Sequence, residues 1–284
     1  MKGIQTYIIT AAIVLAAAAS LASCGEKESR AVAFTLSVGV DAASPDTRAG
    51  SDIHTLTFDV GETFYAEFDR NVNLEFATYT VASEGSDICY VTPDRPTTVA
   101  EGEIAEVEAW YPAKANPGIQ ADQSTDAGYK ASDYMTGTGK INGTTTAQTV
   151  TIAGHSVTLQ PGHGQMIFTH ANAKVLVNAT AKSDLKIQEM VLDPAGVNVT
   201  MYSNAVGESS VHCAALLVPG NFSGNFLVVT TDKGAVTYVL NAASSLEENH
   251  VYTLNIDVAH VGTVVSIEDW DNVLQPVGEA QWQE

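Results

Sequence analysis

The sequence predicts an all-β protein made of two tandem β-sandwich domains. Short runs that alternate apolar and polar side chains, or that are rich in β-branched residues, recur between Gly, Pro, Asn and Asp. A two-residue alternation is the period of a half-buried strand, and no amphipathic helix stands out beyond the N-terminal segment. About sixteen such runs with frequent turns favour two sandwiches over one barrel.

The first expected strand covers residues 31–40 (AVAFTLSVGV), where apolar and polar residues largely alternate. Five more strands are expected before the middle of the chain, at residues 51–60, 62–69, 74–82, 88–92 and 103–111. Residues 114–148 then lack apolar periodicity and are dense in Gly, Thr, Asp and Asn. This composition predicts a long surface loop.

Strand patterns resume after this segment and continue almost to the end of the chain. They cover residues 149–153, 157–160, 165–178, 185–192, 198–202, 211–218, 225–230, 236–241, 251–258 and 263–267. The turn-forming run Pro161-Gly162-His163-Gly164 is the expected seam between the two domains. We therefore expect one domain over residues 49–160 and a second over residues 161–284.

The N-terminus has the pattern of a bacterial lipoprotein signal peptide. Lys2 precedes an uncharged apolar run over residues 8–22, and small residues lead directly into Cys24. An ordinary secretory signal ends in a small-residue site without a required thiol. The run is also shorter than the roughly 20 apolar residues of a membrane-spanning helix. We expect residues 1–23 to be removed, Cys24 to be acylated, and the lipid to hold the precursor in the outer membrane.

Composition limits the class of partner. Lys and Arg number 13 against 33 Asp and Glu, which gives a net charge of −20. Nucleic-acid binding requires clusters of basic residues, so the sequence predicts no nucleic-acid partner. Cys89 and Cys213 lie in apolar, strand-like surroundings far apart in the sequence. We expect two buried free thiols there rather than a disulfide.

No arrangement of residues predicts an enzyme, a cofactor or a metal site. The seven histidines are scattered and form neither H-x-H nor H-E-x-x-H, and no G-x-S-x-G nucleophile motif is present. Asp126 and Asp133 lie in the Gly- and Thr-rich segment, where turn formation explains Asp better than a catalytic carboxylate pair. His163 and His170 straddle an expected strand and are not expected to converge.

One segment indicates proteolytic processing. Residues 44–52 (SPDTRAGSD) are polar and rich in turn formers, and they follow the first expected strand. Arg48 is one of the few basic residues, and an arginine in an exposed linker is a target for a trypsin-like protease. From the spacing alone, an uncut surface arginine is the favoured alternative.

Several short motifs, in this order and spacing, resemble the fimbrillin family, the type V pilus subunits of anaerobic gut and oral bacteria. They are the strand Ala31-Val32-Ala33-Phe34 after the leader, Thr47-Arg48-Ala49, Ala109-Trp110-Tyr111-Pro112, Gln123 with Ser132-Asp133 and Met135, Phe168-Thr169-His170 with Ala173-Lys174-Val175, and the ending from Tyr252-Thr253-Leu254 through Ile267 to Trp270.

The resemblance implies two transthyretin-like β-sandwiches and a role in a cell-surface fimbrium that supports adhesion. It also implies that an arginine-specific protease cuts between Arg48 and Ala49, so that the lipidated leader, residues 24–48, is lost with the first strand. A donor strand from a neighbouring pilin subunit then fills the groove. Arg30 is the alternative site, where a cut would remove the lipid and leave the first strand in place.

The position in the fibre stays open at this level. We expect residues 264–282 to act as the donor strand, with a bend at Pro276, which cannot donate to a ladder. Stalk, tip and anchor roles are all compatible with that ending, and an anchor would keep its lipid. A surface lipoprotein that binds glycans is the alternative function. It is less favoured because Trp110, Trp270 and Trp282 are the only tryptophans.

Overall fold

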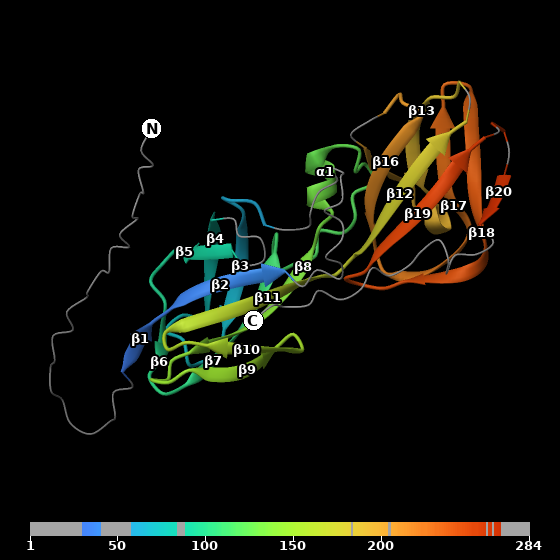
Figure 1. Cartoon of the computed structure of the whole chain (residues 1–284). Helices are drawn as coiled ribbons and strands as arrows, with labels where there is room; N and C mark the ends of the chain where they lie inside the picture. The colour runs from blue at the N-terminus through green and yellow to red at the C-terminus, as the bar shows by residue number, and fades with distance from the viewer. Residues whose placement is uncertain are drawn as a thin grey trace, which may run out of the picture.

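The computed structural model describes residues 30–40, 58–83, 89–182, 184–203, 206–259, 261–262 and 264–267. Figure 1 shows two bodies of β-structure with a short helix between them. The prediction of an all-β protein is confirmed. Cys24, Arg48, Ala49, Pro276 and Trp282 lie outside the described residues. No helix among the described residues is long and apolar enough to cross a membrane.

The first body is a closed barrel with the strand order β11-β2-β5-β4-β3-β7-β8. Its strands are β2 (Thr35–Val40), β3 (Thr63–Phe68), β4 (Phe76–Ser83), β5 (Cys89–Pro93), β7 (Ile104–Tyr111), β8 (Met135–Asn142) and β11 (His163–His170). Two small antiparallel pairs lie beside it, β1 (Ala31–Ala33) with β6 (Thr98–Ala100), and β9 (Gln148–Ile152) with β10 (His155–Leu159).

Aromatic rings fill the middle of the barrel. Phe64 stacks on Tyr79 with centroids 5.5 Å apart and meets Phe168 edge-on at 5.1 Å. Phe58 packs edge-on against Phe168 at 5.0 Å. Phe64, Tyr79 and Phe168 come from three different strands and Phe58 from the segment before β3, so their packing helps to fix how the barrel closes.

The second body is a sandwich of two sheets, β15-β16-β12-β19 and β14-β13-β17-β18-β20. Its strands are β12 (Ala173–Ala181), β13 (Ile187–Leu192), β14 (Val199–Thr200), β15 (Tyr202–Ser203), β16 (Ser210–Leu217), β17 (Gly220–Thr231), β18 (Gly234–Leu246), β19 (Val251–Val258) and β20 (Val264–Ile267). A 3-10 turn, Pro194–Gly196, follows β13. The inner faces bury a separate apolar cluster that includes Val175, Leu192, Phe226 and Leu254.

The prediction of a long loop over residues 114–148 is wrong. The segment contains α1 (Asp126–Ala131) and β8, a strand of the barrel. Gly137 and Gly139 occupy inward positions of β8, because a side chain at Gly137 would lie 3.0 Å from Met166 and Phe168. At Gly139 it would lie 2.6 Å from a backbone oxygen. Glycine at the inward positions therefore hid the apolar alternation of this strand.

The single strand expected over residues 165–178 is two strands. β11 belongs to the barrel and β12 to the sandwich, and the chain crosses from one body to the other at Ala171 and Asn172. The expected seam at residues 161–164 thus overlaps the start of the last barrel strand, β11. Of the strand expected at 51–60, residues 58–60 lie outside any strand and the rest is outside the described residues. The two remaining cysteines, Cys89 and Cys213, are buried free thiols, as predicted.

Candidate assembly site

The first barrel strand, β2, is part of the core. It pairs in parallel with β11 on one edge and antiparallel with β5 on the other. Leu36 and Val38 are 2% and 0% exposed, and Phe34 lies edge-on to Phe68 with ring centroids 6.3 Å apart. A segment at the start of the described chain therefore supplies backbone pairing and apolar volume to the centre of the barrel.

The β11 edge carries the stronger attachment of β2. The backbone N–H of Thr35 donates to the carbonyl of Gly162 at 3.0 Å, and the Thr35 hydroxyl and His163 Nδ1 share a hydrogen bond of 2.9 Å. The Ser37 hydroxyl donates to the Gly164 carbonyl at 3.2 Å. On the other edge β2 pairs with β5 over Leu36 to Val38 alone. If β2 separates from the barrel, its shorter pairing with β5 is therefore expected to break first.

Loss of β2 would leave a groove between β5 and β11. Both strands would present unpaired backbone groups, and the pockets of Leu36 and Val38 would open to water. An incoming extended strand with alternating apolar side chains satisfies the backbone groups and the pockets together. Such a groove would be a candidate acceptor for an extended strand.

Arg30 is poorly placed for cleavage in the folded protein. Its carbonyl oxygen accepts a hydrogen bond from the Glu101 N–H at 2.7 Å, and the next residue begins β1, which pairs with β6. A protease needs an accessible, unpaired backbone, so a cut after Arg30 would require β1 to separate from β6.

At the other end of the chain, β20 lies at the edge of the five-stranded sheet. It pairs in parallel with β18, from Thr237 opposite Val264 to Leu240 opposite Ile267. Val264 is 70% exposed and Val265 is 38% exposed. The described end of the chain is thus a strand with exposed β-branched side chains. The rest of the expected donor segment lies outside the described residues.

A buried glutamine holds the connection between the barrel strands β7 and β8 against the sandwich. The Gln123 side chain is 0% exposed; its amide nitrogen donates to the Leu216 carbonyl at 2.9 Å, and its amide oxygen accepts from the Leu216 N–H at 2.8 Å. The backbone N–H of Gln123 also donates to the Thr200 carbonyl at 3.0 Å. Gln123 therefore pairs with β16 through its side chain as a strand would through its backbone.

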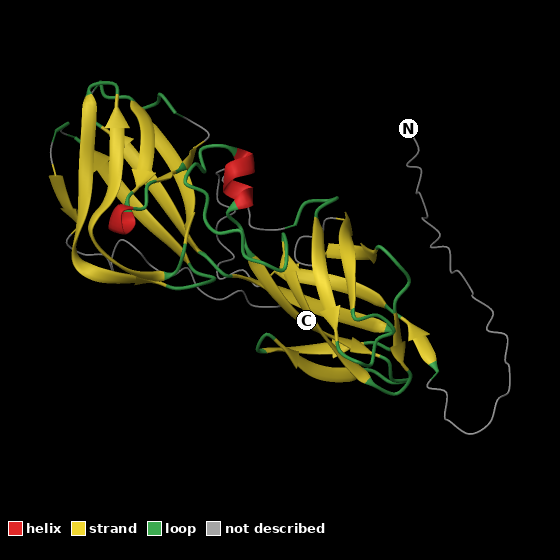
Figure 2. Cartoon of the chain, turned by 180° about the vertical axis from the view of Figure 1, so that it is seen from behind, coloured by secondary structure: helices red, strands yellow, loops and turns green. Residues whose placement is uncertain are grey.

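The short helix α1 contacts both bodies, and Figure 2 shows it between them. Thr125 caps it by accepting the Gly128 N–H, and Tyr129 packs against Ala214 and Leu216 of the sandwich. Lys130 forms an ion pair with Asp59 of the barrel. The helix thus bridges the two bodies.

A buried polar cluster completes this junction. Asp133 and His170 are 7% and 5% exposed, and Asp133 Oδ1 lies 2.7 Å from His170 Nδ1. The Asn172 amide donates to the Ser132 carbonyl at 2.8 Å. Lys174 is 3% exposed; burial lowers its pKa to about 8, and the Asp133 charge opposes the shift. His163 lies at the far end of β11 from His170, so the two histidines do not converge.

The spacing of residues in the sequence could not predict this junction. Asp133 and His170 are 37 residues apart, and Asp133 lies in the short connection between α1 and β8, where the sequence gives no sign of a buried partner. The useful signal was the family resemblance, whose motif residues Gln123, Ser132, Asp133 and His170 all take part in this junction. Among the described residues, no group of three or more His, Cys, Asp or Glu side chains could hold a metal ion.

We expect Gln123→Ala to destabilise the protein by about 2–4 kcal/mol, because it leaves a buried N–H and a buried carbonyl of Leu216 without partners. Urea unfolding followed by circular dichroism measures the change. Gln160→Ala is the matched control: this side chain is exposed, and the loss should stay within about 0.5 kcal/mol. A Gln123→Ala protein as stable as the control would contradict the assigned role.

The fold and this site define an all-β, two-body protein in which β2, near the start of the described chain, closes the barrel between β5 and β11. Residues 42–270 match the family model described as fimbrillin-like, and the chain belongs to that family. Family membership supports a role as a pilus subunit at the cell surface. No curated protein matches the sequence.

Three solved structures illustrate the similarity. A Bacteroides ovatus protein assigned to cell adhesion has 12% identity and a TM-score of 0.50, covering 89% of this chain and 97% of its own. A Bacteroides uniformis protein with the same assignment has 12% identity and a TM-score of 0.49, covering 81% and 94%. The C-terminally truncated tip fimbrial protein of Porphyromonas gingivalis has 14% identity and a TM-score of 0.40, covering 79% and 95%. The first of these supports the fold.

Proposed function

We propose that the protein is a structural subunit of a type V pilus, exported as a lipoprotein and assembled by protease-triggered donor-strand exchange. The observation that carries the proposal is the position of β2, buried between β5 and β11 and followed in the sequence by the Arg48 segment. Substitution of Arg48 tests it, with assembly into SDS-resistant ladders as the readout.

The proposed sequence of events begins at the outer membrane. Cys24 carries the lipid, and an arginine-specific protease cuts between Arg48 and Ala49. Residues 24–48 leave with the lipid, and they take β1 and β2 with them. Strands β5 and β11 then accept a strand from a neighbouring subunit, which restores the ladder and fills the core.

Two observations support Arg48 over Arg30 as the switch. The carbonyl of Arg30 is hydrogen-bonded and its next residue is paired in β1. A cut after Arg30 would also leave β2 in the barrel, so no acceptor groove would form. Only a cut beyond Val40 frees the strand that closes the barrel.

We propose that the donor is the C-terminal segment from about Val264 to Trp282. Support comes from β20, which adopts an extended conformation at a sheet edge with Val264 and Val265 exposed. Pro276 divides the segment into two short pieces. A stalk subunit uses this donor, a tip subunit dispenses with it, and an anchor subunit keeps its lipid.

Cys24→Ala is expected to move the precursor from the membrane fraction to the soluble fraction, because it removes the acylated thiol. Fractionation with a lipid-incorporation assay measures this. Cys89→Ala, which changes a buried thiol of the barrel, should remain membrane-bound. Unchanged fractionation of Cys24→Ala, with no lipid label on the wild-type protein, would exclude lipidation at this residue.

A further inference from the structure

Three aromatic rings lie side by side on the outer face of the barrel. They are Phe76 of β4, Tyr65 of β3 and Trp110 of β7, called the ring ladder below. Tyr65 lies directly opposite Trp110 in the strand register, with centroids 6.0 Å apart. The Tyr65 and Phe76 rings stack at 5.7 Å and 21°. Phe76 is 43% exposed and the other two are partly exposed, so the ladder faces solvent.

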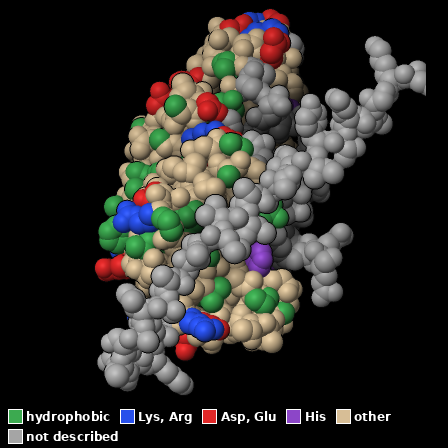
Figure 3. Space-filling model, turned by 90° about the vertical axis from the view of Figure 1, so that its left-hand side faces the viewer, with side chains coloured by type: hydrophobic (Ala, Val, Ile, Leu, Met, Phe, Trp, Pro, Cys, Tyr) green, Lys and Arg blue, Asp and Glu red, His purple; other side chains and the backbone are tan. Residues whose placement is uncertain are grey.

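Two cations already stand over these rings. Lys114 Nζ lies 4.9 Å from the Trp110 centroid and 5.8 Å from that of Tyr65. The Arg95 guanidinium lies 5.8 Å from the Phe76 centroid. Each cation is also neutralised, Lys114 by Glu67 and Arg95 by Asp94 at 3.1 Å. Figure 3 shows one face of the surface, on which apolar side chains adjoin a group of Lys or Arg at the left edge of the view.

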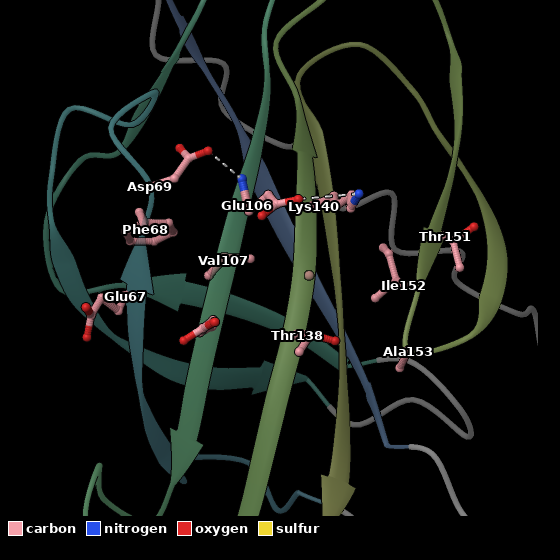
Figure 4. A pocket seen from close by; sticks show the side chains of 12 residues that line it. Glu67, Phe68, Asp69, Glu106, Val107, Thr138, Lys140, Thr151, Ile152 and Ala153 are labelled. Atoms are coloured by element: carbon pink, nitrogen blue, oxygen red, sulfur yellow. Dashed lines mark hydrogen bonds and ion pairs between the residues drawn. The ribbon is translucent and has the colours of Figure 1, made fainter.

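A cavity of about 340 Å³ adjoins the ladder, between the outer face of the barrel and the β9–β10 hairpin. Figure 4 shows side chains of β7 and β8 on one side and Thr151, Ile152 and Ala153 of the hairpin on the other. Glu67 lines the cavity and also pairs with the Lys114 ammonium above the rings, so the cavity and the ladder form one surface. The volume falls at the lower end of ligand pockets, roughly 300–1,000 Å³.

The cavity wall is rich in hydrogen-bond acceptors. Glu106 pairs with Lys140 at 3.6 Å, and the exposed side chains of Glu108 and Thr138 line the same wall. Carboxylates accept hydrogen bonds from hydroxyl donors, and each such charge-assisted bond is stronger than a neutral one. Rings beside acceptors offer one apolar and one polar surface within reach of a single ligand.

We propose that this surface binds a neutral oligosaccharide. The apolar C–H face of a sugar ring packs against the part of the ladder that Lys114 and Arg95 leave exposed, and its hydroxyls donate to the carboxylates of the cavity. An anionic ligand would meet Glu67, Glu106 and Glu108, and a cationic one would meet Lys114 and Arg95 already over the rings. Like charges would therefore repel either kind of ligand, whereas a neutral, polyhydroxylated ligand would not be repelled by the carboxylates or by the cations.

This inference goes beyond the proposed function of a structural pilus subunit by naming a class of ligand that the subunit binds. Sequence reasoning gave the glycan-binding alternative less weight because tryptophan is scarce. The ladder uses a single tryptophan and draws its other rings from β3 and β4, which only the fold brings together. Sugar binding by the unpolymerised chain does not require strand exchange, so the two proposals fail separately.

The test uses the full chain after residue 23 with Cys24→Ala, which stays soluble and unpolymerised. Fluorescently labelled protein is applied to an array of neutral, sialylated and sulfated glycans and a Lys-rich peptide. We expect retention on neutral glycans. Phe76→Ala and Trp110→Ala should weaken that binding at least tenfold, and Tyr90→Ala should not change it. Tyr90 is 68% exposed on β5, away from the ladder, and is the matched control.

Thermal unfolding of each variant verifies its folding, and Phe76→Ala keeps the test valid if Trp110→Ala does not fold. Three outcomes would overturn the proposal: no neutral glycan bound above background, binding confined to the charged glycans or the peptide, or neutral-glycan binding unchanged in folded Phe76→Ala. Binding that is lost equally in Tyr90→Ala would also place the site elsewhere.

Discussion

Arg48→Ala is expected to arrest the protein as a stable monomer in the presence of an arginine-specific protease, with SDS-resistant ladders reduced to background. The uncut chain keeps β2 in the barrel. Strands β5 and β11 then stay paired with β2, and no other strand can enter between them. Immunoblots of cells that express the variant, together with size-exclusion chromatography of the purified protein, measure the effect.

Arg70→Ala is the matched control, because Arg70 is an exposed arginine of the barrel that no step of assembly uses. It should assemble like the wild type, and so should Arg30→Ala. Ladder formation by Arg48→Ala at the wild-type level would show that Arg48 is not the switch.

The size of this effect follows from burial. Leu36 and Val38 are almost fully buried, and each contributes about 1.5–3 kcal/mol when transferred from water to the core. The burial free energy lost with both side chains is a large part of the roughly 5–15 kcal/mol by which a typical domain is stabilised. A cut subunit without a donor should therefore unfold or aggregate, which couples cleavage closely to strand capture.

The second large effect is expected at the C-terminus. Deletion of residues 272–284 should leave a folded monomer that no longer polymerises, because β20 keeps its pairing with β18 while most of the proposed donor is absent. Circular dichroism and thermal unfolding measure the fold, and the cleaved truncated protein is assayed for ladders.

Pro276→Ala provides the control for the deletion, because it alters the proposed bend and keeps the apolar residues of the segment. It should still form ladders. A truncated protein that polymerises normally would show that the tail is dispensable, and a tip or anchor role would then gain support.

The strand pattern was readable from the sequence where inward side chains are large. Residues 31–40 and 251–258 alternate plainly, and the structure has strands there. The pattern failed in β8, where Gly137 and Gly139 leave room for Met166 and Phe168. It also merged β11 with β12, because both are apolar and only Ala171 and Asn172 separate them.

The candidate sites were predictable to different degrees. Removal of the first strand is implied by the family resemblance and stays a prediction; the structure adds that β2 lies between β5 and β11. The Asp133–His170 pair and the ring ladder were not expected, because each joins residues far apart in the sequence. Side chains that meet only through strand register leave no local signal in one sequence.

The most direct test of strand replacement is the intact mass of subunits dissociated from assembled fibres. The proposed mechanism predicts a chain that begins at Ala49, with residues 24–48 and their lipid absent. Fibre subunits that still begin at Cys24 or Ala31, and so retain Leu36 and Val38 in the same chain, would contradict it.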